Sequence, residues 1–235
     1  MNYKEVMDFL ENKGSEQSRK IYSNHGAPEN MYGVKVADMK VVQKKVKINH
    51  ELANELYASK NADAQYLAGL IADPKAFSKE EFKQWADAAT WYMVTEYALA
   101  WNLAESPLCM EIALEWIEDD DAKLQQCAWA AMAAYLGITS NEEIDNGKHE
   151  ELLNRIKNEI HEAENRVRYT MNGYVIALGG AIPELTEACK TAGDEIGKVQ
   201  VSMGNTACKV PTIRQYIEKM EDRNRIGKKK KQAKC

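Results

Sequence analysis

The sequence predicts an all-α fold in which pairs of helices repeat and stack into a curved α-α superhelix. Residues 124–132 and 167–175 resemble each other, and their first positions lie 43 residues apart. A similar run begins at Ala64, 60 positions before Leu124, which suits one and a half repeats. A period near forty residues with two helices per unit is typical of HEAT-like repeats. Because such a solenoid has a long concave surface, we expect a groove that holds an extended partner.

The composition agrees with a helical protein that is large enough for a substantial core. Of the 235 residues, 45% are hydrophobic and 29% are charged, and only five are prolines. Three of these, Pro107, Pro183 and Pro211, precede helical patterns, where proline is tolerated at the first helical position. No apolar run approaches the roughly 20 residues that span a bilayer, and the N-terminus lacks a signal-peptide pattern. We therefore expect a cytoplasmic protein.

Helical periodicity and capping signals mark the elements in order. Asn49 is a predicted N-cap, Ser78 and Glu81 form a capping box, and Ser140 and Glu143 form another. Glycine or Asp-Pro sequences end several of the periodic segments. The predicted helices cover 3–13, 16–24, 36–47, 49–59, 61–72, a segment from 78, 90–104, 107–118, 123–135, 152–162, 165–178, 183–191 and 210–220.

The chain is predicted to form a single HEAT-like repeat domain over 1–222. Within it, residues 199–210 alternate with period two around a Gly-Asn turn and are predicted as an extended loop or a small hairpin. Residues 223–235 hold seven basic and no acidic residues, and we expect a disordered basic tail. Since the whole chain carries −5, residues 1–222 carry −12 without those seven cations. Nucleic-acid binders are commonly basic, so binding to DNA requires the cations of the body to gather on one face.

Familiar catalytic and cofactor motifs are missing from the sequence. Residues 193–198 contain two glycines, but their spacing is not that of a phosphate-binding loop. None of the four histidines pairs with another four positions on, which argues against zinc. We expect no cofactor, no metal and a monomer. We also expect reduced thiols, because no Cys-x-x-Cys pair occurs among Cys109, Cys127, Cys189, Cys208 and Cys235.

The segment from Thr90 to Trp101 is the most informative part of the chain. On an α-helix, Trp91, Thr95, Ala98 and Asn102 fall on one stripe. This stripe mixes a large aromatic side chain with small and polar ones, which suits the wall of a groove. Packing of Trp91 in the core is the alternative.

At this point the chain resembles a known family, the HEAT-like alkylpurine DNA glycosylases or AlkD family of DNA alkylation repair enzymes. The resemblance covers roughly residues 20–220 and rests on the order of the repeats and the Trp91 helix. It also rests on residues 124–128, 165–168 and 32–40, the last without the family's proline. The resemblance implies a concave groove that binds duplex DNA with an alkylated base. In the family that base is lost through an oxocarbenium-like sugar, which a carboxylate stabilises.

The family's functional residues match this sequence only in part. Active members carry Trp-x-x-x-Asp on the central helix, a later arginine and a tryptophan in the following repeat. Trp91 matches the first tryptophan, but the aspartate falls at Thr95, the arginine at Gln126 and the later tryptophan near Gly173. Glu96 is the alternative catalytic residue. Because it is rotated by about 100° from Thr95 on an α-helix, it requires a shift of the helix register.

Three hypotheses follow. The first is a DNA-binding member of the family that recognises damaged or distorted DNA with weak or no glycosylase activity. The second is an active glycosylase that uses Glu96, and the third is a protein-binding scaffold, which the acidic body favours. For DNA binding, the candidate residues are Trp91, Thr95, Gln126, Arg166, Arg168, Lys40, Lys44, Lys228, Lys229, Lys230 and Lys231.

Overall fold

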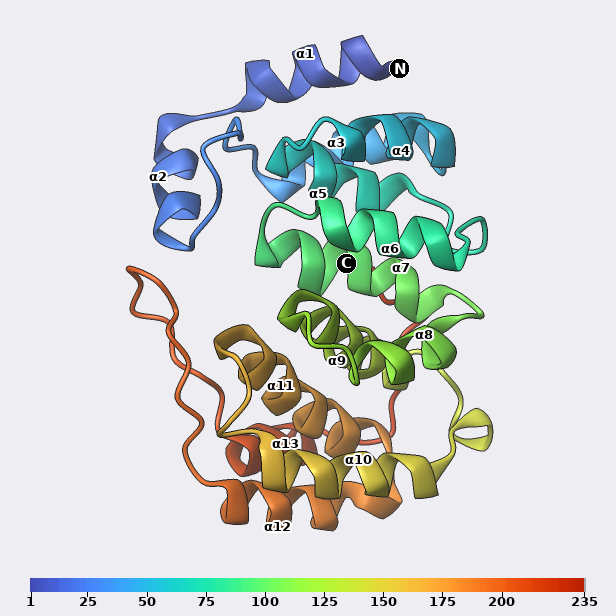
Figure 1. The fold of residues 1–235 in the computed structure, drawn as a ribbon, viewed down its shortest axis with the longest axis vertical. Coiled ribbons are helices and arrows are strands. Elements are labelled where there is room, and N and C mark those ends of the chain that lie inside the picture. The colour runs from blue at the N-terminus through green and yellow to red at the C-terminus, as the bar shows by residue number, and fades with distance from the viewer. Residues whose placement is uncertain (235) are drawn as a thin grey trace. The chain divides into compact units, whose positions relative to one another are not determined.

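The fold is all-helical, as the sequence predicts, with no β-strand among residues 1–234, which the computed structural model describes (Figure 1). The contacts divide these residues into two compact units. The N-terminal unit holds residues 1–108, 203–207 and 234, and the C-terminal unit holds residues 109–202 and 208–233. Single-domain behaviour of residues 1–222 stays a prediction, for which one cooperative unfolding transition is the test.

The N-terminal unit is organised around one central helix. All ten residues of α5 (Ala62–Ile71) are buried, and α3, α4 and the π-helix η1 pack against it. The other elements of this unit are α1 (Tyr3–Lys13), α2 (Glu16–Asn24), α3 (Val36–Val46), α4 (His50–Ala58), α6 (Lys79–Ala88), η1 (Val94–Leu99) and α7 (Ala100–Glu105). A helix that is buried on every side needs neighbours on every side, which repeated helix pairs provide.

Predicted capping residues begin several of these helices. The Asn49 side chain accepts a hydrogen bond from the backbone of Leu52 at the start of α4. Ser78 and Glu81 form the predicted capping box at the start of α6. Each cap satisfies amide groups that lack partners within the first turn, so the sequence signal marks the helix start correctly.

The C-terminal unit is built on two long helices, α9 (Ala122–Leu136) and α11 (Asn165–Ala181), which pack closely together. Its other elements are α8 (Cys109–Trp116), η2 (Asn141–Glu143), α10 (Asn146–Glu159), η3 (Pro183–Leu185), α12 (Thr186–Ile196) and α13 (Ile213–Asp222). The rings of Trp129 and Tyr174 meet edge to face with centroids 5.1 Å apart. Buried His149 lies 2.5 Å from the Tyr174 hydroxyl, measured from its Nδ1.

The structure differs from the predicted elements most clearly at Ser140 and in the segment 90–104, and α10 and α12 span other residues than the predicted 152–162 and 183–191. The Ser140 and Glu143 signal gives only the short 3₁₀ turn η2, and α10 begins later with Asp145 as its N-cap. The helix predicted over 90–104 is a π-helix followed by α7. The hydrophobic pattern alone does not distinguish a π-turn from an α-turn, because both bury the same residue types.

The two segments that flank α13 are an extended loop and a C-terminal tail that contacts helix ends. Residues 197–212 run as an extended loop, and no strand pairing occurs within it in the described chain. The sequence predicts a disordered tail from residue 223, whereas residues 223–234 contact helix ends; Cys235 lies outside the described residues. Lys229 Nζ donates to the Leu136 carbonyl at 2.8 Å, and Lys234 Nζ donates to the Ala72 carbonyl at 2.7 Å. Carbonyls at helix C-termini attract cations, which explains these contacts.

Candidate nucleic-acid interface

Trp91 is held firmly just before the η1 helix, and the residue is partly exposed. Its indole Nε1 donates to the His25 carbonyl at 2.9 Å. The rings of Tyr22 and Tyr92 lie 5.6 Å and 5.4 Å from the Trp91 ring, measured between centroids. The four residues form an aromatic cluster whose indole cannot rotate freely.

A buried glutamine braces the turn that leads into Trp91. Gln65 lies on α5 and is fully buried. Its amide nitrogen donates to the Ala88 carbonyl at 2.8 Å, and its oxygen accepts from the Thr90 hydroxyl at 2.6 Å and from the Thr90 backbone at 3.1 Å. Sequence reasoning could not predict this role, since a lone glutamine inside a buried helix has no distinctive pattern.

Asp63 organises the connector beside the aromatic cluster. Its carboxylate accepts hydrogen bonds from the backbone amides of Tyr32 at 2.6 Å, Gly33 at 2.9 Å and Val34 at 3.0 Å. Burial raises the pKa of Asp63, and the three amide hydrogen bonds oppose that rise. The Tyr22 hydroxyl then donates to the Val34 carbonyl at 3.0 Å, so Asp63 indirectly positions a ring that contacts Trp91.

The tip of the extended loop adds to this part of the N-terminal unit. The Asn205 amide donates to the Asn24 carbonyl at 3.0 Å, next to His25. Gly204 has a φ of +69°, and a Cβ placed there would lie 2.4 Å from the Asn24 oxygen, so only glycine fits. Residues 203–207 are therefore fixed beside the residue whose carbonyl holds the Trp91 indole.

The stripe below Trp91 is core, and the expectation of a groove wall along it is wrong. Thr95 is 2% exposed, and Ala98 and Asn102 are fully buried. The Asn102 amide donates to the carbonyls of Gly69 at 2.9 Å and Ala98 at 2.7 Å, where α5 and η1 approach closely. Thr95 thus faces packed helices, and its hydroxyl turns back to the Trp91 carbonyl at 3.4 Å.

Glu96 lies within the π-turn and is 6% exposed. A π-turn winds more widely than an α-turn and rotates the following side chains. This is the kind of register change that the Glu96 hypothesis requires. A carboxylate buried to this extent needs polar or charged partners, so its burial alone does not give it a catalytic role. That role stays a prediction.

The matching positions of the C-terminal unit are also placed. Gln126 on α9 is 7% exposed, and its amide Nε2 has no hydrogen-bond partner. A Cβ added at Gly173 on α11 would meet no atom within 4 Å, so the position faces open space. Gln126 thus keeps a buried donor without a partner, and Gly173 leaves room where a large side chain is absent.

The two arginines at the start of α11 have different surroundings. The Arg166 guanidinium lies over the Tyr169 ring at 4.3 Å. Arg168 donates to the carbonyls of Ala163 at 2.6 Å and Gln200 at 3.3 Å, so it braces the extended loop. Both arginine side chains are partly exposed.

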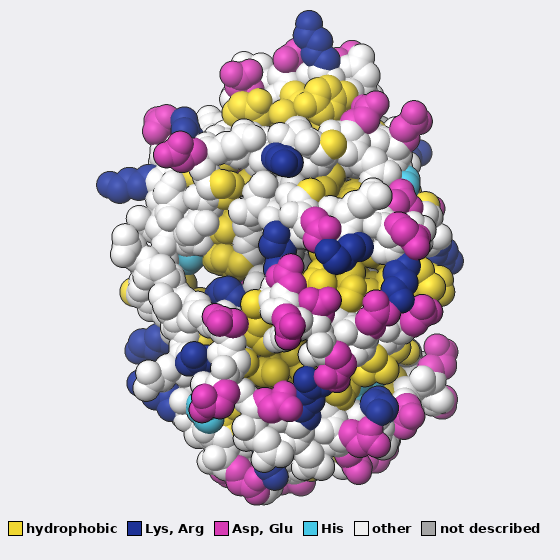
Figure 2. All heavy atoms as spheres, in the orientation of Figure 1, with side chains coloured by type: hydrophobic (Ala, Val, Ile, Leu, Met, Phe, Trp, Pro, Cys, Tyr) yellow, Lys and Arg dark blue, Asp and Glu magenta, His cyan; other side chains and the backbone are white. Residues whose placement is uncertain are grey.

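The predicted DNA-binding lysines also differ in their exposure and in their contacts. Lys44, Lys228, Lys230 and Lys231 are exposed, and Lys40 is partly exposed. Lys229 is engaged with a helix end, and burial lowers its pKa. On the face drawn in Figure 2, basic and acidic side chains are intermixed.

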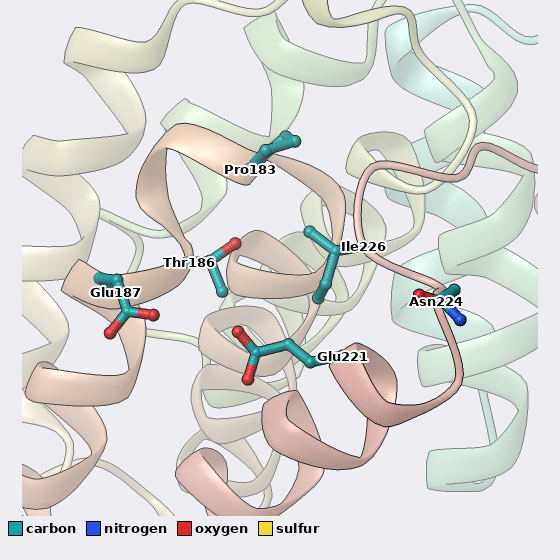
Figure 3. A pocket seen from close by; sticks show the side chains of 6 residues that line it. All are labelled: Pro183, Thr186, Glu187, Glu221, Asn224 and Ile226. Carbon is teal, nitrogen blue, oxygen red and sulfur yellow. The ribbon is translucent and has the colours of Figure 1, made fainter.

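Two cavities lie within the C-terminal unit. One of about 1210 Å³ lies beneath the extended loop, between the ends of α11, α12 and α13. The other, about 440 Å³, is lined by Pro183, Thr186, Glu187, Glu221, Asn224 and Ile226 (Figure 3). The carboxylates of Glu187 and Glu221 bind the ammonium group of Lys190, so this smaller cavity has its charges satisfied internally.

Other chemistry receives little support from the described residues. No group of three or more His, Cys, Asp or Glu within residues 1–234 is arranged to hold a metal ion. Burial raises the pKa of the Cys109 and Cys189 thiols to about 12, which makes them poor nucleophiles. No helix in this part of the chain is long and apolar enough to cross a membrane.

Residues 6–188 match the family described as DNA alkylation repair enzyme. The chain belongs to the DNA alkylation repair enzyme family. Among its relatives, the uncharacterized protein Lmo0209 of Listeria monocytogenes is 36% identical over 212 residues, which cover 88% of this chain and 91% of that protein. Lin0241 of Listeria innocua is 35% identical over 214 residues, with the same coverage of both chains.

A solved structure agrees with this member of the DNA alkylation repair enzyme family over its whole length. It is described as a new family of proteins related to the HEAT-like repeat DNA glycosylases with affinity for branched DNA structures. The TM-score is 0.92 at 36% identity, and the match covers 100% of both chains. The prediction of a HEAT-like repeat fold is therefore confirmed.

Proposed function

We propose that this protein binds branched or distorted DNA and does not excise bases. The whole-chain similarity to a protein with affinity for branched DNA structures is the observation that carries the proposal. The partly exposed Trp91, fixed by the His25 carbonyl, provides a rigid ring on which an unpaired base can stack. In this proposal the protein acts in the cytoplasm as a monomer.

The absence of base excision follows from the residue at the carboxylate position. Cleavage of the N-glycosidic bond develops positive charge on the sugar, and a nearby carboxylate stabilises that charge. Thr95 carries no charge, is 2% exposed and turns its hydroxyl toward the Trp91 carbonyl. A neutral side chain that faces the core cannot supply the missing stabilisation.

The phosphate contacts come from basic side chains at the surface. Lys40, Lys44 and the exposed lysines of 228–231 are the candidates, together with the partly exposed Arg166. In this proposal Arg168 positions the extended loop, because its guanidinium already donates to two backbone carbonyls.

Fluorescence anisotropy with a labelled three-way junction and a linear duplex of equal base-pair number tests this proposal. We expect tighter binding to the junction and an affinity that falls steeply with salt, as phosphate contacts require. Trp91→Ala is expected to weaken junction binding by about 1–3 kcal/mol, the range for loss of one stacked base. Failure to bind either DNA in low salt would contradict the proposal and favour the protein-binding scaffold.

An active glycosylase is the second candidate, and the π-turn that contains Glu96 favours it. It predicts release of methylated bases from alkylated DNA and loss of that release in Glu96→Gln. We expect no release above the rate of spontaneous loss in the wild type. Release that depends on Glu96 would establish the second candidate instead.

A further inference from the structure

Helix α3 carries a cluster of lysines without ionic partners. Lys44, Lys45 and Lys47 are exposed, and Lys40 is partly exposed. None of the four forms an ion pair within residues 1–234, whereas Lys83, Lys148 and Lys157 elsewhere are paired with carboxylates. We call the four lysines, together with Val41 and Ile48, the α3 ridge.

The α3 ridge is the outer face of a helix whose inner face is packed. Met39 and Val42 are buried, and α3 packs on α1 and α5. Val41 is 42% exposed and Ile48 is 57% exposed, two of only six large hydrophobic side chains that are exposed in the described chain. Lys40, Lys44, Lys45 and Val41 are thus on the solvent side of α3, and Lys47 and Ile48 continue the exposed stretch just past its end.

This local charge contrasts with the rest of the body. Residues 35–47 hold five lysines and one aspartate, a net charge of +4, within a body of −12 over residues 1–222. Lys40 and Lys44 are like charges four positions apart and repel each other, whereas Lys44 and Lys45 in the last turn interact favourably with the helix dipole. A cationic surface of this kind fits a polyanion.

The backbone at Lys47 is a second unusual feature. Lys47 ends α3 with a φ of 61° and a ψ of −142°, a region that favours glycine. Strain of this kind persists where the surroundings or a function maintain it. A lysine at a position that suits glycine keeps a positive charge at the end of the ridge.

We propose that the α3 ridge binds the phosphate backbone of a second duplex arm of branched DNA. The proposal rests on the proposed function. Lys40 and Lys44 lie on one face of α3, separated by about 6 Å of helix rise, and Lys47 follows at the C-cap. The flexible side chains of these lysines can follow a row of phosphates. Val41 and Ile48 offer aliphatic contact to the sugars between those phosphates.

The geometry of the N-terminal unit explains why this surface selects a branch. Helix α3 and helix η1 both pack on α5, so the ridge and Trp91 belong to one compact unit. A protein with two separate DNA-binding surfaces in fixed relation gains most from a ligand with two arms. A linear duplex offers only one helix axis to the same two surfaces.

The test compares junction and linear DNA in anisotropy titrations over a series of salt concentrations. The ridge variant is K40A/K44A/K45A/K47A. Its matched control is K83A/K148A/K157A/K219A, which changes the net charge equally on lysines outside the ridge. We expect the ridge variant to lose about tenfold or more in junction affinity and to reduce the salt slope by up to about 4, nearly one for each lost phosphate contact.

The discriminating quantity is the ratio of junction affinity to linear-duplex affinity. The inference requires this ratio to fall in the ridge variant and to stay at the wild-type value in the control. An unchanged ratio in the ridge variant, while wild-type protein still prefers the junction, overturns the inference alone. Wild-type protein that binds neither DNA overturns the proposed function as well.

Two further measurements keep the result specific. Lys47→Gly relieves the positive φ, so we expect higher stability in urea together with weaker junction binding; stronger or equal binding would contradict the inference. Sedimentation with phosphatidylserine vesicles that depends on the ridge, with unchanged DNA affinity in the ridge variant, would assign the surface to a membrane instead and overturn it.

Discussion

Replacement of Gly69 by alanine tests whether the helix below Trp91 is buried against α5. A Cβ at position 69 would lie 2.4 Å from Ala98 Cβ and 2.6 Å from Ala98 Cα. Neither atom is the end of a flexible side chain, so one of the two helices must move. Such overpacking costs about 3 kcal/mol at the upper end of the usual range, against about 1 kcal/mol gained from better helix propensity. We therefore expect Gly69→Ala to destabilise the protein by about 2 kcal/mol.

Gly173→Ala is the matched control for this substitution. Gly173 also lies inside a helix, but an added Cβ would meet no atom within 4 Å. It should leave stability unchanged or raise it by up to about 1 kcal/mol. Urea denaturation followed by circular dichroism measures both variants, with the midpoint as the readout. A stabilised Gly69→Ala variant would refute the close approach of α5 and η1, and with it the burial of Thr95.

Three other predictions follow from the buried polar groups and thiols. Burial lowers the pKa of His149 to about 4, so the unfolded chain binds the proton more readily. The contribution of His149 to the free energy of unfolding should be fully present above about pH 6.5 and should fall by up to about 3 kcal/mol as the pH drops toward 4. Unfolding measured over this pH range should show a smaller loss in His149→Gln. Equal acid sensitivity of the two proteins would contradict the prediction. Asp63→Asn replaces an acceptor of three backbone amide hydrogen bonds. It should lower the free energy of unfolding in urea by about 2–4 kcal/mol, because buried amides lose their partner. A change below about 0.5 kcal/mol would show that these hydrogen bonds do not stabilise the connector. In a Cys235→Ser background, Cys208 should react with a maleimide in the native state while the three buried cysteines react only after unfolding, and labelling of more than one thiol in mass spectrometry would contradict their burial.

Much of the fold could be predicted because helix capping and periodicity are local. Asn49 and the pair Ser78 and Glu81 mark helix starts through contacts within one turn. The same local logic fails at Ser140, where the chain makes one 3₁₀ turn and Asp145 caps the following helix. Which of two nearby caps begins a helix depends on tertiary packing.

The candidate site was less accessible to prediction because its supports are distant in sequence. Gln65 and Asp63 act on backbone groups more than twenty residues away, and no spacing rule announces such contacts. The π-turn at 94–99 has the composition of an ordinary helix, so the predicted stripe continued into the core. The tail lysine Lys234 has a buried ammonium group whose pKa burial lowers to about 8, although its local sequence resembles a solvated tail.

A single-turnover assay of base release, combined with DNA titration, separates DNA binding from base excision. Excess protein is incubated with DNA that carries 7-methylguanine and 3-methyladenine, and free bases are measured by chromatography, while the same preparation is titrated with a three-way junction. We expect salt-dependent junction binding together with base release at the spontaneous rate. Release above that rate, abolished by Glu96→Gln while junction binding is retained, would contradict this expectation.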